Sequence, residues 1–228
     1  MITTILNIET ATDTCSICIS RDQRILAQET INEPFQHAAR ITLLIKACLE
    51  KAALTLDEID ALAVSRGPGA YTALRIGISV VKGIAYALDK PVIAIDTLQA
   101  LALATANSIK KEGIYHPMID ARRMEVYTAS FDETGKRLSE AESKIITEDS
   151  FQEEIKEGKS IFLSGNGAAK CTAVLTSKQI EYLEVYCDSA HLVPLAHRAF
   201  EAGNFVDIAY FTPFYLKPPN ITIAKKKL

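Results

Sequence analysis

The stretch SRGPGAYTALRIGISVVKGIAYAL, residues 65–88, runs from a glycine-proline-glycine loop directly into a long apolar segment. Glycine allows a ligand to approach the backbone closely, and the free N–H groups at the start of a helix attract anions. The arrangement is therefore typical of a phosphate-binding loop. However, the loop lacks the Lys-Ser/Thr pair of a P-loop, so a tight turn without a ligand is the simpler interpretation.

The apolar segment predicts a helix over residues 73–88, with Thr72 as its N-cap. Its polar residues are confined to one narrow stripe, so most of the helix surface must be covered. One flank is covered either by a second predicted helix, residues 36–52, or by a partner protein, and the residues alone leave both alternatives open. This flank consists of Leu74, Ile78, Val81 and Ala85.

The chain on either side of this stretch shows one order of elements twice. In each half we expect three strands, a helix, a strand and then a glycine loop that enters a helix. The loop of the second half is GNGAAKCTAVL, which begins at Gly165. The expected strands are residues 5–8, 15–20, 25–29, 59–65 and 91–95, then 116–120, 125–131, part of 137–146, and 161–164, with a second-half helix over 150–157.

Individual residues also correspond between the halves. Two duplicated α/β halves of this order predict two ribonuclease-H-like lobes of the actin/sugar-kinase (ASKHA) type. We expect the first lobe to span residues 1–102 and the second 103–228, with the last residues returning to the first lobe. Glu9 and Asp120 end the first strand of each half, and Gly67 and Gly69 correspond to Gly165 and Gly167.

Active members of that architecture hold a metal ion with the acid at the end of the first strand, and phosphates with the glycine loops. Here a glutamate stands in the first half, where its longer side chain would shift the carboxylate. In the second half Asp120 is followed by Arg122 and Arg123, which can pair with it. We therefore interpret these loops as a vestigial nucleotide site, whose residues are Glu9, Thr10, Gly67, Gly69, Asp120, Gly165 and Gly167.

The composition excludes several classes of function. The 228 residues carry a net charge of −3, so we expect this chain alone not to hold RNA through phosphate contacts. The chain does not begin with a basic region followed by an apolar one, and no window approaches the roughly 20 apolar residues of a membrane helix. We expect a cytoplasmic protein without a membrane segment. Lys225, Lys226 and Lys227 predict a solvated tail.

The sequence gives little support for metal or redox chemistry. An odd number of cysteines, five, indicates free thiols, and Cys15 and Cys18 fall on opposite sides of one predicted strand. We expect no metal site, no cofactor and no catalytic residue, because the histidines do not pair at helical spacing. They are His37, His116, His191 and His197.

Five stretches, in order along the chain, resemble the TsaB family, also called YeaZ. They are ILNIETATDTCSICI, GPGAYTALRIGISVVKGIAYALDKPVIAIDTLQALA, MIDARRMEVYTASFD, LSGNGAA and PFYLKPP. The resemblance implies a non-catalytic scaffold that supports a TsaD-like catalytic subunit in making N6-threonylcarbamoyladenosine on transfer RNA. It also implies that Thr97 and Leu101 stand where the catalytic subunit carries a pair of metal-binding histidines.

The resemblance further implies that the two predicted helices contact the partner, and it favours a partner over internal cover for the apolar flank. The implied partners are the TsaD-like subunit and a TsaE-like ATPase, with a homodimer when the chain is alone and tRNA bound only within the complex. The residues so assigned to partner binding are Ile41, Leu44, Ile45, Leu74, Arg75, Ile78, Val81 and Ala85.

Two other functions remain as alternatives. One is an ASKHA-type enzyme, either a small-molecule kinase or a metalloprotease-like hydrolase, which needs an acid and phosphate loops in both lobes or the missing histidines. The other is a nucleotide sensor, which fits the glycine loops but not the glutamate at position 9.

Overall fold

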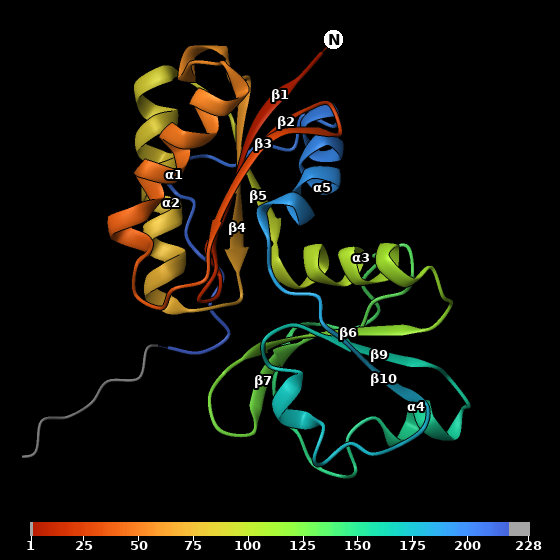
Figure 1. Ribbon diagram of the computed structural model, residues 1–228. Helices are drawn as coiled ribbons and strands as arrows, with labels where there is room; N and C mark the ends of the chain where they lie inside the picture. Colours follow the sequence, from red (N-terminus) through yellow and green to blue (C-terminus); the bar gives the residue numbers. More distant parts are fainter. Residues whose placement is uncertain (1, 219–228) are drawn as a thin grey trace, which may run out of the picture.

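The first lobe is built on a five-stranded sheet (Figure 1). The computed structural model of the protein describes residues 2–218, so the expected lysine tail at 225–227 lies outside the described residues. The sheet has the order β3-β2-β1-β4-β5, in which β1 to β3 are antiparallel neighbours and β4 and β5 run parallel to β1. Its strands are β1 (Thr4–Glu9), β2 (Cys15–Arg21), β3 (Arg24–Ile31), β4 (Ala61–Gly67) and β5 (Val92–Asp96).

The second lobe repeats this sheet. Its order is β10-β9-β6-β7-β8, so that β6 takes the central place of β1 and the pairing directions are the same. The predicted fold class is therefore confirmed: the chain forms two ribonuclease-H-like α/β lobes of the actin/sugar-kinase type. The strands are β6 (Ile114–Asp120), β7 (Glu125–Thr128), β8 (Glu142–Ile145), β9 (Ile161–Ser164) and β10 (Ile180–Leu183).

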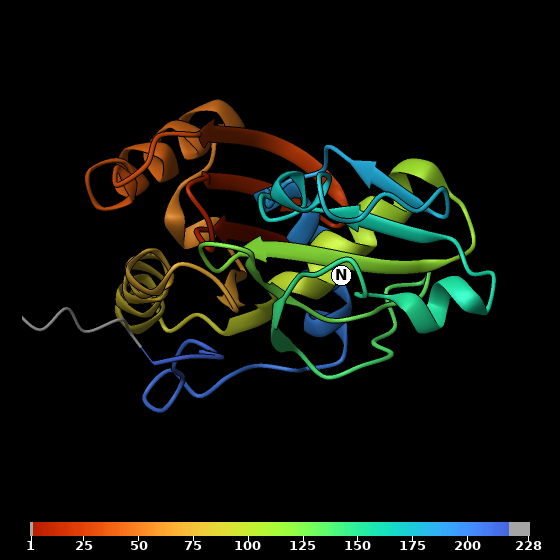
Figure 2. The same ribbon diagram turned by 90° about the horizontal axis from the view of Figure 1, so that it is seen from below.

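Helices cover both faces of the first sheet (Figures 1 and 2). The helices α1 (His37–Ala52) and α2 (Tyr71–Leu88) lie on one face, and α5 (Ser189–Glu201) lies on the other. Side chains alternate along a strand, so Leu6 of β1 packs toward α1 and α2 while Ile5 packs toward α5. Because both faces are covered, the strands read as almost continuous apolar runs.

The last helix of each half packs on the sheet of the other half. The helix α3 (Thr97–Ile109) follows β5 but contacts β6 and β9, whereas α5 follows β10 but contacts β1 and β5. The expected lobe boundary at residues 102 and 103 falls within α3, which packs with the second lobe, while α5 returns to the first lobe. Eight of the 13 residues of α3 are buried, as expected for a helix held between two layers.

The helices of the second lobe are short. The helix α4 (Gln152–Lys156) has five residues, and the 3-10 turn η2 (Ala169–Cys171) stands where the sequence predicted a helix after the second glycine loop. That prediction is wrong, because bonds to the third residue back hold the chain in successive turns while Cys171 fills the core. A further 3-10 turn, η1 (Leu56–Glu58), precedes β4.

The apolar flank of α2 lies inside the lobe. Leu74, Ile78, Val81 and Ala85 are at most 4% exposed, and Ile41 and Ile45 of α1 are equally buried. The expectation that these side chains face a partner is therefore wrong, because α1 and the sheet already cover them. Thr72 is not the cap either: α2 begins at Tyr71, with Ala70 as its N-cap and no side-chain cap bond.

By length and composition alone, α2 is apolar enough to cross a membrane, which the sequence reading did not anticipate. The packing of α2 against β4 and α1 gives another reason why the helix is apolar. A helix between a sheet and a second helix must be apolar over most of its circumference.

We expect Ile78→Asp to destabilise the fold by at least about 4 kcal/mol, because the change removes a buried side chain and places an unpaired charge in the core. The matched control is Ser79→Asp, at the exposed neighbouring position, for which we expect a change within about 0.5 kcal/mol. Urea unfolding followed by circular dichroism measures both. Equal stability of the two variants would contradict the burial of this flank of α2 under α1 and the sheet.

Candidate functional site

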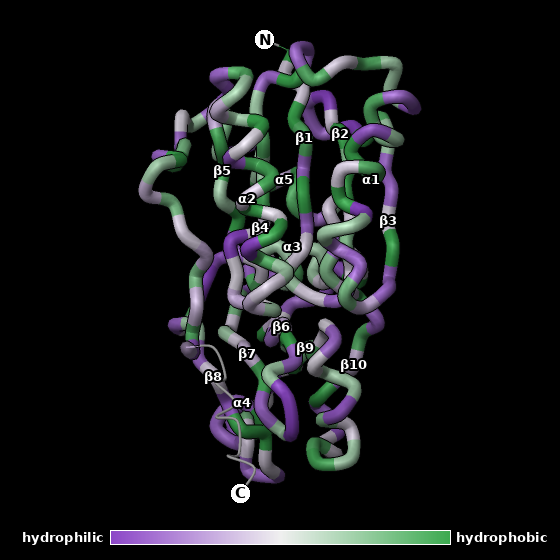
Figure 3. Tube along the Cα trace, turned by 90° about the vertical axis from the view of Figure 1, so that its left-hand side faces the viewer, coloured by the Kyte–Doolittle hydropathy of each residue, from purple (hydrophilic) through white to green (hydrophobic). Residues whose placement is uncertain are grey.

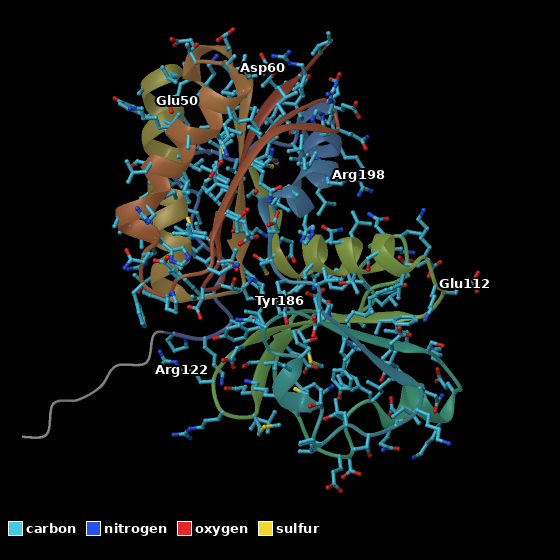
Figure 4. All side chains as sticks on the ribbon, in the orientation of Figure 1. Glu50, Asp60, Glu112, Arg122, Tyr186 and Arg198 are labelled. Atoms are coloured by element: carbon cyan, nitrogen blue, oxygen red, sulfur yellow. The ribbon has the colours of Figure 1, made fainter. Side chains whose placement is uncertain are left out.

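A cavity of about 690 Å³ lies between the lobes, at the ends of β1 and β6. It is lined by the turn after β1, the first glycine loop, the turn after β6 and the last described residues of the chain. Arg122, labelled in Figure 4, lies at this cavity. The structure thus brings together the two turns and two loops that the sequence assigned to a vestigial nucleotide site. Asp120 and Gly69 line the cavity directly, and Asn166 of the second loop joins them.

The first glycine loop uses two of its backbone donors on the chain itself. The N–H group of Gly67 donates to Thr97 Oγ1 at 3.1 Å, and that of Ala70 donates to the carbonyl oxygen of Ala11 at 2.7 Å. A Cβ atom on Gly69 would lie 2.3 Å from the same carbonyl oxygen. Glycine is therefore required because the loop packs directly on the turn after β1.

The second glycine loop repeats this packing. The N–H groups of Gly165 and Gly167 donate to the carbonyl oxygens of Val185 and Met118, at 2.8 and 2.9 Å. A Cβ atom on Gly165 would lie 2.3 Å from Met118 O. Donors that already have partners inside the chain are not free to bind a phosphate.

The two acids at the strand ends have different environments. Glu9 is 1% exposed, lies behind the cavity, and accepts the N–H group of Ala11 through Oε1 at 2.6 Å. Burial raises the pKa of Glu9 to about 7, with a smaller contribution from the negative charge of Asp188. Asp120 is exposed at the cavity and forms an ion pair with Lys170.

The expected pairing of Asp120 with the following arginine side chains is wrong. Arg122 donates its backbone N–H group to Asp120 Oδ1 at 2.9 Å, and Lys170 provides the charge. Glu9 and Asp120 therefore share one local geometry, in which a carboxylate accepts the N–H group two residues further along. This geometry closes a turn without a ligand.

Thr10 is fully buried and supports α2. Its N–H group donates to Ser65 Oγ at 3.2 Å, and a Cβ atom on Gly77 would lie 2.3 Å from Thr10 Oγ1. Gly77 is therefore explained by the close approach of α2 to the turn after β1. Nothing lies within 4 Å of a Cβ atom built on Gly83, so packing within the described chain does not explain that glycine.

Thr97 and Leu101 stand where the resemblance expects metal-binding histidines in a catalytic subunit, and both have structural roles here. Thr97 accepts the N–H group of Gly67, and Leu101 is 1% exposed in the core between α3 and the second sheet. In residues 2–218, no three His, Cys, Asp or Glu side chains are grouped to hold a metal ion. All five cysteines are free and buried, and burial raises the pKa of Cys15, Cys18 and Cys48 to about 12.

The helices α1 and α2 share an exposed face, toward which Figure 3 looks. Of the residues expected to bind a partner, only Arg75 is exposed there, while Leu44 is half-buried. Sequence reasoning missed most of this face because it sorted residues by polarity, whereas exposure depends on where α1 lies. We define the helix face as Ala39, Leu43, Lys46, Thr72, Arg75, Ser79, Gly83 and Tyr86.

Sequence reasoning also missed an aromatic contact at the start of α2. Tyr71 stacks on Tyr215 with ring centroids 4.5 Å apart, and Arg75 Nε donates to Tyr215 Oη at 3.0 Å. Because Arg75 and Tyr215 are 140 positions apart, local periodicity carries no signal of this contact. The motif PFYLKPP, which contains Tyr215, and the expected return of the last residues to the first lobe were the two hints of this contact.

Comparisons with known proteins agree on one family. The model of the TsaD family, described as tRNA N6-adenosine threonylcarbamoyltransferase, matches residues 24–210. The tRNA threonylcarbamoyladenosine biosynthesis protein TsaB of Escherichia coli is 29% identical over 98% of this chain and 97% of its own length. The protein of the same name from Bacillus subtilis is 32% identical over 56% of this chain and 55% of its own. The solved structure of YeaZ from Pseudomonas aeruginosa is 28% identical, with a TM-score of 0.80 over 94% of this chain and 100% of that one.

We expect Glu9→Gln to change how stability depends on pH. Glu9 keeps its proton when folded up to about pH 7, whereas its ordinary pKa is 4.5. As the pH rises from 4.5 to about 7, the unfolded chain ionises first, so the unmodified protein should lose stability relative to the variant, by roughly 3 kcal/mol in total.

Urea unfolding at pH 4.5, 6 and 8 measures this difference between the variant and the unmodified protein. Glu50→Gln is the control, because Glu50 is exposed on α1 (Figure 4). A constant difference between Glu9→Gln and the unmodified protein across these pH values would show that Glu9 does not hold its proton.

The two helix glycines should respond oppositely to alanine. We expect Gly77→Ala to destabilise the chain by about 1–3 kcal/mol, because the new Cβ atom would collide with Thr10. Gly83→Ala should stabilise it by up to about 1 kcal/mol, since alanine is the better helix former and the space is open. Thermal unfolding of the isolated variants decides this, and a loss of stability in Gly83→Ala would contradict the open environment.

Proposed function

The chain belongs to the family that the TsaD model describes and, within it, to the TsaB (YeaZ) family, and from this premise we propose that it is the non-catalytic partner of a TsaD-like subunit. Its relatives, by their names, act in the biosynthesis of threonylcarbamoyladenosine on tRNA, and this chain has a role in the same pathway. The family model itself is that of the threonylcarbamoyltransferase, which supports a TsaD-like protein as the partner.

The observation that carries the proposal is the contrast between the cavity and the helix face. At the cavity, both strand-end acids are already bonded within the chain, and so are the N–H groups of Gly67, Ala70, Gly165 and Gly167. On the helix face, Leu43 is 54% exposed, Tyr86 is 83% exposed, and Gly83 has open space beside it. Apolar side chains and a bare glycine on paired helices favour packing of a helix from another chain.

A non-catalytic role is also supported by the chemistry that the residues offer. Thr97 and Leu101 provide a hydroxyl group and a hydrocarbon where the resemblance expects metal-binding histidines in a catalytic subunit. Both are engaged in the core, so neither is available to a substrate. In this proposal the TsaD-like partner supplies the reactive centre.

The remaining partners belong to the same proposal. The helix face would be used for a homodimer when the TsaD-like subunit is absent, because one surface cannot hold both. A TsaE-like ATPase and tRNA would join only the assembled complex, in the cytoplasm. The net charge of −3 supports the expectation that tRNA needs the other subunits.

A nucleotide sensor is the second candidate function, and the volume of the cavity favours it. A cavity of about 690 Å³ falls within the usual range for small-molecule sites, roughly 300–1,000 Å³. Calorimetric titration of the isolated chain with ATP decides between the two. Binding in the micromolar range would favour the sensor, whereas an absence of heat would favour the scaffold.

We expect Leu43→Asp to leave the fold intact and to weaken binding of the TsaD-like subunit at least about tenfold, or about 1.4 kcal/mol, because it places a charge on the helix face. The matched control is Leu138→Asp, since Leu138 is 53% exposed and lies in the second lobe, whereas Leu43 is 54% exposed on α1. Calorimetry or biolayer interferometry with the purified subunit measures the affinity. Equal binding by the two variants would move the interface away from the helix face.

A further inference from the structure

The last described residues of the chain hold the start of α2. We call residues 214–217 the C-terminal strap. The N–H group of Phe214 donates to the carbonyl oxygen of Arg66 at 2.7 Å, which fixes the strap at the end of β4. Lys217 forms an ion pair with Glu125, at the start of β7 in the second lobe. The strap is therefore anchored on both lobes, on either side of Tyr215.

Between these anchors, Tyr215 meets Arg75 and Tyr71 of α2. The guanidinium carbon of Arg75 lies 4.2 Å from the centroid of the Tyr71 ring and 5.9 Å from that of Tyr215. Arg75 Nε donates to Tyr215 Oη at 3.0 Å, and the two rings stack on each other. An exposed arginine normally samples many rotamers, but this one is restrained by two aromatic rings and a hydrogen bond.

The restrained guanidinium has no acidic partner within the part of the chain that the structure describes. Among residues 2–218, no carboxylate forms an ion pair with Arg75, whereas Lys217 and Arg66 each have one. Residues 219–228 contain neither Asp nor Glu. Toward the described residues, Arg75 donates only through Nε, so its two terminal nitrogens retain donors in a planar fork. This fork matches the two oxygens of a carboxylate.

We propose that Tyr71 and Tyr215 hold Arg75 ready to bind a carboxylate side chain of the TsaD-like subunit at the edge of the helix face. The inference rests on the proposed function for the identity of the partner. Arg75 lies on the same stripe of α2 as Ser79 and Tyr86, so a chain that packs on this stripe reaches it. A side chain that is already ordered loses little entropy on binding, which is why such arginines become centres of affinity.

The test compares four variants for binding to the TsaD-like subunit at two salt concentrations. Arg75→Ala should weaken binding at least tenfold and reduce its dependence on salt. Arg75→Lys should not restore it, because an ammonium group lacks the fork. Tyr215→Phe, which retains the ring and loses the hydroxyl group, should weaken binding severalfold. Lys178→Ala removes an exposed cation of the second lobe and should bind as the unmodified chain does.

A second measurement needs no partner. In the isolated chain, the Nε–H group of Arg75 should give a restrained NMR signal that becomes mobile in Tyr215→Phe, with thermal stability nearly unchanged. An equally mobile signal in both proteins would overturn the restraint. Unchanged affinity in Arg75→Ala, an equal loss in Lys178→Ala, or full rescue by Arg75→Lys would overturn the carboxylate contact.

The two measurements separate the failure of this inference from the failure of the proposed function. If the unmodified chain does not bind the TsaD-like subunit, the proposed function fails and the carboxylate contact fails with it, while the NMR result still decides whether Arg75 is restrained. If the unmodified chain binds and the variants behave alike, only the inference is overturned.

Discussion

Two aspartates at helix N-termini hold the lobes together, and the rest of the architecture depends on them. Asp96 caps α3 by accepting the N–H group of Gln99, and it also pairs with Arg137 of the second lobe at 2.9 Å. Asp188 caps α5 by accepting the N–H group of Ala190, and it accepts a second bond from Gln28 of the first lobe at 2.7 Å. Each carboxylate thus satisfies the start of a helix that follows one lobe and packs on the other. This reciprocal packing fixes the distance between the two sheets.

The cavity follows from that arrangement. With the sheets fixed, the turn after β1 and the end of β6 meet the glycine loops of their own lobes, and close packing requires glycine at Gly69 and Gly165. The same residues that would cradle a phosphate in an open cleft here bind neighbouring backbone. A glycine loop is therefore weak evidence for a ligand, because close approach of the chain to itself has the same requirement as close approach of a nucleotide.

The helix α2 serves both sides of the protein. Its buried side packs on the sheet and on α1, and Gly77 allows the approach of Thr10. Its exposed stripe carries Arg75, Gly83 and Tyr86, none of which is needed by the core. One glycine of this helix is thus explained by the fold and the other is not. Because the fold leaves Gly83 unexplained, the outer surface of α2 is a better candidate for a binding site than the loop at the start of the helix.

The sequence by itself determined the repeated order of strands, and with it the two lobes, because the spacing of apolar residues follows the period of each strand. It also determined the absence of a histidine pair, since Thr97 and Leu101 can be read directly. Only the tertiary structure decided which flank of α2 is buried, where the lobe boundary lies, and that Tyr215 meets Arg75. An apolar flank has the same pattern whether α1 or another chain covers it, and a contact across 140 positions leaves no periodic signal. Which surface becomes covered depends on the path of the whole chain, and no local sequence pattern encodes that path.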